Sequence, residues 1–361
     1  MSSYFINGIG IISPQKTYEP ERFLEEVFSY EDNLLNCLTP DFKTFINPLQ
    51  LRRLGRMLRI GLTASILCQR EAGLTMPDGI ITGTGYGFLE ETEKFLREII
   101  DRKEQQISPA FFMQGTYNAL SGLVALSLKC TGYNNTYVSK GFAFEHALND
   151  ALMQIDDDPG MNFLVGGYDE GAKVQHTTGL REGHYKKNPI SSLNLFTNKE
   201  TGTIQGEGAA FFALSGTAGE NTWCELIDVQ TVYRPDELDL LLAVEKFLQT
   251  NNTTVGKVDA VINGMAGDPI RDKVIGSLGH GILGDVPQLR FKHLSGEYCT
   301  AICFGLWLGA KIIKTQNIPD AVKVQDSTYP KGISTILIVN QYLGRNYSLI
   351  LLKNCPARGN S

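Results

Sequence analysis

Seven cysteines are the residues of this chain best suited to nucleophilic chemistry, because a thiolate can hold an acyl group as a thioester. Their number is odd and no two have CxxC spacing, so the pattern favours neither a disulfide framework nor a zinc site. We expect no metal ion or other cofactor. Cys299 and Cys303 stand four residues apart in an apolar segment, where a cysteine usually behaves as a small hydrophobic side chain. The full set is Cys37, Cys68, Cys130, Cys224, Cys299, Cys303 and Cys355.

Two pairs of neighbouring polar residues offer other nucleophiles or bases. Ser139 and Lys140 could form a serine–lysine pair, but adjacent residues on a strand point to opposite faces. Glu145 and His146 could face a cavity, and the simpler interpretation of His146 is a packed or interface histidine. Neither pair by itself defines a catalytic site.

The composition is that of an ordinary soluble protein. With 42% hydrophobic and 20% charged residues, a chain of 361 residues can bury one large core or two fused cores. The net charge of -6 argues against a nucleic-acid partner. No run approaches the roughly 18 apolar residues of a spanning helix, and the N-terminus lacks a signal-peptide pattern. We therefore expect a cytoplasmic protein with no membrane partner.

Strands and helices alternate along the first half of the chain. Apolar spacing predicts a helix over residues 54–71. The run DGIITGTGYG at 78–87 predicts a buried strand ending in a glycine-rich turn, followed by a charged amphipathic helix over 88–102. A short strand at 135–139 then leads through a turn into a helix over 144–155. This order is typical of a layered α/β protein.

The rest of the sequence extends this pattern. Residues 15–50 are expected to form an irregular helical excursion, and 107–112 a break. After residue 218 the order of strands and helices resembles that of the first half. We therefore predict two duplicated halves, 1–218 and 219–361, in one compact unit.

Five segments, in this order, make the chain resemble the β-ketoacyl-acyl-carrier-protein synthases, the condensing enzymes of the thiolase superfamily. The resemblance spans most of the chain and implies a thiolase-like, five-layer αβαβα fold, with residues 135–139 at a dimer interface. The segments are IITGTGYGFLEE at 80–91, ISPAFF at 107–112, FLVGGYDE at 163–170, IQGEGAAFFALS at 204–215 and RNYSLILLK at 345–353.

The resemblance also implies where the catalytic residues should stand. A condensing synthase carries the acyl chain on a cysteine at a helix N-terminus and uses two histidines to polarise the thioester carbonyl of malonyl carrier protein. The nucleophile position falls closest to Gly141, within VSKGF. Asn263 replaces the first histidine and Glu297 the second, and only Lys292 looks retained.

The loss of the nucleophile does not depend on the exact alignment, because no cysteine lies between Cys130 and Cys224. Losing one member of a nucleophilic constellation typically costs about 10⁴- to 10⁶-fold in rate. Three simultaneous replacements therefore leave no intact catalytic site. His293 could replace a lost histidine only in a different register, and the simpler interpretation is a loop histidine.

Two further groups of residues follow from the resemblance. Four arginines near the start of one helix match a region close to the docking face for acidic carrier proteins, although a solvated helix face would explain them as well. They are Arg52, Arg53, Arg56 and Arg59. Tyr342 stands near the family's phenylalanine gate, and Phe142 and Phe144 stand near the lost nucleophile. These aromatic side chains are candidates to limit an acyl tunnel, and core packing is the alternative.

The sequence thus predicts a chain-length-factor-like subunit, not catalytic alone. It would pair with an active ketosynthase in type II fatty acid, polyketide or aryl-polyene biosynthesis and would meet the acyl carrier protein. One alternative is a divergent thiolase-fold acyltransferase or malonyl-thioester decarboxylase with a relocated nucleophile. Another is a homodimeric binder of acyl thioesters.

Overall fold

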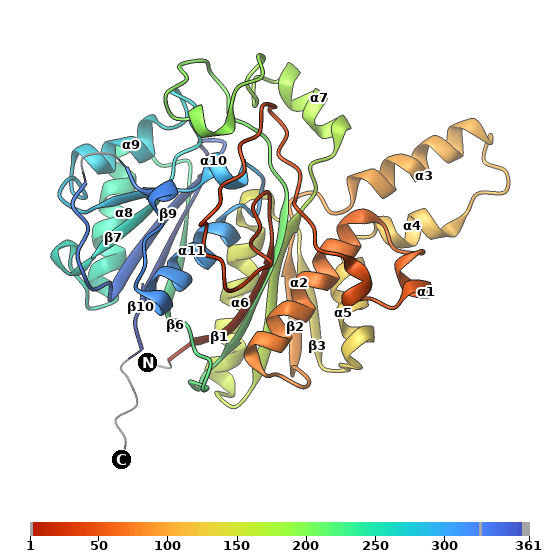
Figure 1. Cartoon of the computed structure of the whole chain (residues 1–361), viewed down its shortest axis with the longest axis horizontal. Coiled ribbons are helices and arrows are strands. Elements are labelled where there is room, and N and C mark those ends of the chain that lie inside the picture. The colour runs from red at the N-terminus through yellow and green to blue at the C-terminus, as the bar shows by residue number, and fades with distance from the viewer. Residues whose placement is uncertain (1–2, 325–326, 356–361) are drawn as a thin grey trace.

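A computed structural model describes residues 3–324 and 327–355 of the chain. Its strands form one ten-stranded sheet, and its helices cover the faces of that sheet (Figure 1). The strands are β1 (Phe5–Ile12), β2 (Gly79–Gly83), β3 (Tyr133–Tyr137), β4 (Asn162–Asp169), β5 (Gly208–Ser215), β6 (Cys224–Tyr233), β7 (Ala260–Gly264), β8 (Gln288–Arg290), β9 (Thr335–Tyr342) and β10 (Asn346–Lys353). The helices are α1 (Pro48–Leu51), α2 (Arg56–Ala72), α3 (Leu89–Asp101), α4 (Pro109–Gly115), α5 (Ala119–Leu128), α6 (Ala143–Asp157), α7 (Lys173–Arg181), α8 (Glu237–Thr250), α9 (Lys273–His280), α10 (Lys292–Ser295) and α11 (Ile302–Thr315).

The strand order reveals two halves of the same design. The sheet runs β3-β2-β4-β5-β1 and then β6-β10-β9-β7-β8. Reading outward from the centre, β1 corresponds to β6, β5 to β10, β4 to β9, β2 to β7 and β3 to β8. In each half the strands toward the outer edge pair in parallel, and those toward the centre pair antiparallel. The duplicated order predicted from sequence is therefore confirmed. We propose that the halves divide at residue 218, in the connection between β5 and β6.

Three hydrophobic clusters give the molecule five layers. The central cluster lies between the two half-sheets and contains the inner sides of α6 and α11, for example Phe144 and Phe304. Helices α2 and α5 cover the outer face of the first half-sheet, where Met57 and Leu120 lie in one cluster with Ile80. Helices α8 and α9 cover the outer face of the second. The predicted αβαβα architecture is confirmed.

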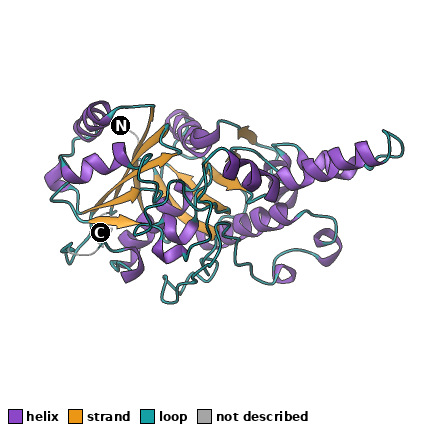
Figure 2. Ribbon diagram, turned by 90° about the horizontal axis from the view of Figure 1, so that it is seen from above, coloured by secondary structure: helices purple, strands orange, loops and turns teal. Residues whose placement is uncertain are grey.

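Helix α11 is the most fully buried of the longer helices. All of its residues from Ile302 to Ile313 are buried, as an apolar helix packed between two sheets requires. At one side of the molecule, α3 and α4 extend away from the sheet as an arm (Figures 1 and 2). Within the described residues, none of the helices is both long and apolar enough to cross a membrane.

Two expectations about local structure were wrong. Residues 15–50 are mostly irregular, with only a 3-10 turn at Phe42–Thr44 and the short α1. Side chains satisfy this backbone instead: Gln15 Nε2 donates to the Phe28 carbonyl at 3.1 Å, and its Oε1 accepts the Phe28 amide at 2.8 Å. The expected break at 107–112 contains the start of α4, where Ser108 accepts the Ala110 amide and Pro109 occupies the first turn.

Candidate functional site

The turn between β3 and α6 holds the position where the sequence predicts a missing nucleophile. Strand β3 passes through a 3-10 turn (Lys140–Phe142) directly into the N-terminus of α6, and Lys140 has a left-handed φ of 51°. Gly141 is buried in this turn. A Cβ atom built on Gly141 would lie 2.7 Å from both Cβ and Cδ1 of Tyr342. The Tyr342 side chain therefore occupies the space that a nucleophilic side chain would need.

Tyr342 is the last residue of β9, and its side chain is buried. Only 7% of the residue is exposed, and it lies beside Cys299 and Tyr86. Cys299 is the thiol beside Tyr342, and burial raises the pKa of this thiol well above its ordinary value. Burial raises the pKa of Cys303 in the same way. Both cysteines are thus neutral thiols near pH 7, which makes them poor nucleophiles.

A buried ion pair stands where the sequence predicts the position of the second histidine. Lys292 Nζ donates to Glu297 Oε2 at 2.7 Å, and both side chains are almost fully buried. The other oxygen, Glu297 Oε1, has no hydrogen-bond partner among the described residues. Burial raises the pKa of Glu297 to about 7, with Lys292 acting in the opposite direction. The pair contains no imidazole group. The positive charge of Lys292 is already paired with the Glu297 carboxylate.

Asn263, which the sequence predicts at the first histidine position, is hydrogen-bonded within its own turn. Its Oδ1 accepts the Met265 amide at 3.0 Å, and its Nδ2 donates to Gln288 Oε1 at 3.3 Å. The amide therefore braces the loop after β7. Asn263 is buried, with only 5% of the residue exposed.

Gln341 connects the positions that the sequence predicts to be degenerate. The Gln341 carbonyl accepts a hydrogen bond from Lys292, and its side chain donates to Asp272 at 3.1 Å. Asp272 in turn accepts the amides of Ala266 and Gly267, in the loop that follows Asn263. Because Gln341 directly precedes Tyr342, these loops and the turn at Gly141 all meet at the end of β9. Sequence reasoning missed Asp272 and Gln341, since only the fold makes them neighbours.

The structure also places the other nucleophile and base candidates, Ser139, His146 and His293. Ser139 Oγ lies 3.1 Å from His146 Nδ1, so the structure pairs this serine with the histidine and not with Lys140. Burial lowers the pKa of His146, which favours the neutral imidazole. His293 is committed elsewhere: its Nε2 lies 2.8 Å from the Ala321 carbonyl, and burial lowers its pKa to about 4.

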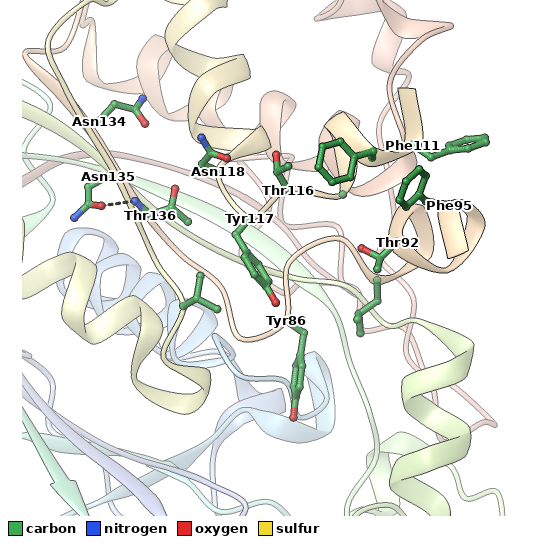
Figure 3. A pocket seen from close by; sticks show the side chains of 14 residues that line it. Tyr86, Thr92, Phe95, Phe111, Thr116, Tyr117, Asn118, Asn134, Asn135 and Thr136 are labelled. Carbon is green, nitrogen blue, oxygen red and sulfur yellow. Dashed lines mark hydrogen bonds between the residues drawn. The ribbon is translucent and has the colours of Figure 1, made fainter. Parts of the chain in front are cut away.

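Two cavities lie next to one another near Tyr342. One of about 300 Å³ is lined by Tyr342, Tyr86 and Leu89 together with residues of α7. The other, of about 750 Å³, shares Tyr86 and Leu89 and extends to β3 and the arm. In Figure 3, Asn134, Asn135 and Thr136 lie on one side of this larger cavity and Phe95 and Phe111 on the other, with Tyr117 between. The phenylalanines of the ISPAFF segment were the sequence signal that could have found it.

The three tunnel candidates occupy different environments. Tyr342 lines the smaller cavity. Phe144 is fully buried in the central core, with its ring centroid 5.4 Å from that of Phe212. Phe142 contacts His146 and Tyr233. The structure therefore does not bring the three together.

The four arginines also separate into two groups. Arg52 and Arg53 are exposed in the turn between α1 and α2. Arg56 instead forms a double ion pair with the fully buried Glu207, and its Nη1 lies 2.8 Å from Oε2. Arg59 donates from Nε to the Leu54 carbonyl at 2.8 Å.

A buried carboxylate explains how two of the sequence segments come together. Asp169, in GGYDE, accepts the Gly85 amide of GTGYG at 2.8 Å and both the amide and hydroxyl of Thr300 at 2.9 Å. Burial raises the pKa of Asp169 to about 6 against these hydrogen bonds. Among residues 3–324 and 327–355, no group of three or more His, Cys, Asp or Glu is placed to hold a metal ion.

Comparisons with known proteins agree with this fold. The family model for the Beta-ketoacyl synthase, N-terminal domain, matches residues 12–218. The chain therefore belongs to the β-ketoacyl synthase family. A comparison with curated proteins gives no match to the sequence.

Solved structures share the fold over nearly the whole chain. The ishigamide ketosynthase/chain length factor has a TM-score of 0.79 at 15% identity, covering 98% of this chain and 100% of that one. A β-ketoacyl synthase from Burkholderia phymatum STM815 has a TM-score of 0.78 at 14% identity, covering 99% and 100%. A ketosynthase in complex with its chain length factor from Xenorhabdus doucetiae has a TM-score of 0.73 at 13% identity, covering 98% of both chains.

Proposed function

We propose that this protein is a non-condensing subunit that pairs with an active ketosynthase and shapes the acyl tunnel at their interface. The observation that carries the proposal is Tyr342 packed over Gly141. A synthase needs a nucleophile at this turn, and here neither the side chain nor the space for it is present. A partner subunit needs only the fold and the interface.

The exposed surface around β3 supports an interface there. Strand β3 is the end strand of the sheet, and its outer edge has no strand beside it among the described residues. Next to it lies an apolar surface, the β3 face, formed by Phe112, Tyr117 and Val138, which are 57%, 50% and 42% exposed. An open strand edge beside exposed aromatic groups is a surface that a partner would cover.

The larger cavity supports a role in holding an acyl chain. It lies beside the β3 face, and its wall on the side of the arm is aromatic, with Phe95 and Phe111. A partner's acyl chain crossing the interface would enter this cavity, and Tyr86 and Leu89 would separate it from the smaller cavity. The length of the cavity would then limit the length of the product.

The comparisons support the same partners. Two of the similar structures are described as ketosynthases with chain length factors, and another as a type II acyl carrier protein in complex with its ketosynthase. We propose that this chain meets an acidic carrier protein at Arg52 and Arg53, which are the exposed members of the arginine group.

Co-expression with an active ketosynthase from the same organism tests the proposal. We expect a 1:1 complex in size-exclusion chromatography, active in condensation, whereas this chain alone is inactive. In that complex, Phe111→Ala should shift the products to longer chains, and Phe144→Leu in the central core serves as the matched control. Exclusive formation of homodimers would instead support a homodimeric thioester binder and would refute the pairing.

A second candidate function rests on the hydrogen bond between Ser139 and His146. A neutral histidine beside a serine at a strand-to-helix turn could activate that hydroxyl for acyl transfer. The test is intact mass spectrometry of this chain after incubation with an acyl thioester. A stable acyl adduct that Ser139→Ala abolishes would establish the relocated nucleophile, and an unmodified mass would exclude it.

A further inference from the structure

The turn between β3 and α6 contains a strained lysine. Lys140 has a φ of 51°, in the left-handed region that side chains other than glycine rarely adopt. Gly141, the next residue, does not have a positive φ, so the adjacent glycine does not carry this conformation. Lys140 also begins a 3-10 turn, whereas left-handed residues are common where a helix ends. Strained residues persist where surrounding contacts hold them, and they cluster at functional sites.

The Lys140 side chain lies over the ring of Tyr86. Its Nζ atom is 5.9 Å from the ring centroid, which is within the range of a cation–π contact. Lys140 is exposed, and none of the ion pairs of residues 3–324 and 327–355 includes it. Within this part of the chain, the Tyr86 ring is therefore the group that orients the lysine charge.

Tyr86 lines both the smaller and the larger cavity. Its backbone is fixed, because the Tyr86 amide donates to Asp169 Oδ1 at 3.3 Å and the Gly85 amide donates to the same oxygen at 2.8 Å. In Figure 3 the Tyr86 ring points away from Asn118, which lines the larger cavity only. The side chain is only half-buried, so its ring can change rotamer unless another side chain holds it.

We propose that Lys140 is a positioning residue that holds the Tyr86 ring between the two cavities and so keeps them separate. The inference rests on the proposed function, because it treats the two cavities as parts of a site for acyl chains. A charge held over the face of the ring disfavours rotamers that move the ring out of this contact. Because such a contact is weak at an exposed site, it shifts the rotamer equilibrium by about two- to fivefold.

Hydroxyl-radical footprinting of the full chain, read by peptide mass spectrometry, measures the accessibility of the Tyr86 ring. Lys140→Met keeps a long side chain and removes the charge, so we expect oxidation of Tyr86 to rise by about threefold. Lys140→Arg keeps the charge and should behave like the wild type. Lys129→Met is the matched control and should also behave like the wild type. Lys129 is another exposed lysine with a left-handed φ, 54°, but it follows the end of α5 and lines neither cavity.

Isothermal titration of the same variants with dodecanoyl- and butanoyl-N-acetylcysteamine measures the consequence for the cavities. In Lys140→Met we expect the dodecanoyl thioester to bind about threefold more tightly, because a long chain can then pass from one cavity into the other. Binding of the butanoyl thioester should not change. Lys140→Gly should bind the dodecanoyl thioester as Lys140→Met does and yet have a higher melting temperature, because glycine is unstrained at this φ. General destabilisation would move these two quantities differently.

Three results would overturn the inference: unchanged oxidation of Tyr86 in Lys140→Met, an equal rise in Lys140→Arg, or an equal gain in affinity for both thioesters. If neither thioester binds to the wild type, the acyl site of the proposed function fails, whereas footprinting still decides the role of Lys140. Partner assembly is not a readout here, so failure of the Lys140 contact leaves the proposed pairing untouched.

Discussion

At the scale of single residues, the Tyr342 side chain leaves no space for a larger side chain at Gly141. Gly141→Cys should not restore acylation, because its Cβ would meet the Cβ and Cδ1 of Tyr342 at 2.7 Å. Overpacking a buried site typically costs about 1–3 kcal/mol. We therefore expect Gly141→Cys to lower the free energy of unfolding by about that amount, measured by urea denaturation, with no acyl adduct in intact mass spectrometry.

A double-mutant cycle with Tyr342→Gly, which removes both Cβ and the ring, separates this clash from other effects of the new side chain. Removing the ring opens the space above residue 141, so the cost of Gly141→Cys should fall when both changes are present. Simple additivity of the two changes would contradict the packing argument.

Glu145 should make the free energy of unfolding depend on pH. It lies fully buried on α6, and neither carboxyl oxygen has a hydrogen-bond partner among the described residues. Burial raises its pKa from 4.5 to about 7, against smaller opposite effects of Ser348 and Lys292. Since the unfolded chain releases this proton first, the contribution of Glu145 to stability falls as pH rises from 4.5 to about 7 and then stays level.

Glu145→Gln should remove this decline. Relative to the wild type, the variant should gain up to about 3 kcal/mol between pH 4.5 and 8, as the pKa shift implies, measured by urea denaturation across that range. Glu220→Gln, at an exposed site, controls for the substitution itself. A variant less stable than the wild type at pH 8 would mean that the carboxylate has a favourable partner.

The residues of the candidate site were predictable only in part. Gly141, Asn263 and Glu297 could be proposed from sequence, because each was placed by comparing the residues around it with the family's catalytic motifs. Tyr342 lies on a strand some 200 residues from Gly141 in sequence, and nothing local shows that its ring covers that turn. The Asp272–Gln341 contact likewise joins separate segments, so it depends on how the sheet assembles.

At the scale of elements, the start of α2 separates a structural arginine from docking candidates. Arg56→Ser would leave the buried Glu207 carboxylate without its cation, and we expect a loss of about 3 kcal/mol in the free energy of unfolding.

Arg52→Ser with Arg53→Ser should leave stability unchanged and weaken binding of an acidic carrier protein, measured by surface plasmon resonance at low salt. Unchanged carrier binding in the double variant would refute docking at this turn.

The helices and strands with strong periodicity were predictable from sequence, and the irregular ones were not. Helix α2 differs from its predicted bounds by only a residue or two, because its apolar face repeats at helical spacing. Helix α7 and strand β8 were not predicted, since both are short and α7 lacks a strongly apolar face. Residues 15–50 take their shape from contacts such as that of Tyr30 with Pro14, which periodicity does not encode.

At the scale of the whole molecule, helices cover both faces of the sheet, but the arm and the edge of β3 are exposed. The inner faces of both half-sheets are covered by α6 and α11, and the outer faces by α2, α5, α8 and α9. Within residues 3–324 and 327–355, no helix or strand covers the arm and the outer edge of β3, although they carry exposed aromatic groups beside the larger cavity. The fold is therefore complete within one chain, whereas this surface is suited to a second chain.

A charge placed on that surface should disrupt assembly without disrupting the fold. Phe112 is 57% exposed on α4, so Phe112→Asp removes little packing within the chain but would bury an unpaired carboxylate in the interface. We expect the variant to keep the wild-type melting temperature and to elute as a monomer when co-expressed with the ketosynthase. Leu238→Asp, at a 62% exposed site on α8 in the opposite outer layer, is the matched control and should still form the complex. If Phe112→Asp pairs as well as Leu238→Asp does, the subunit interface lies elsewhere.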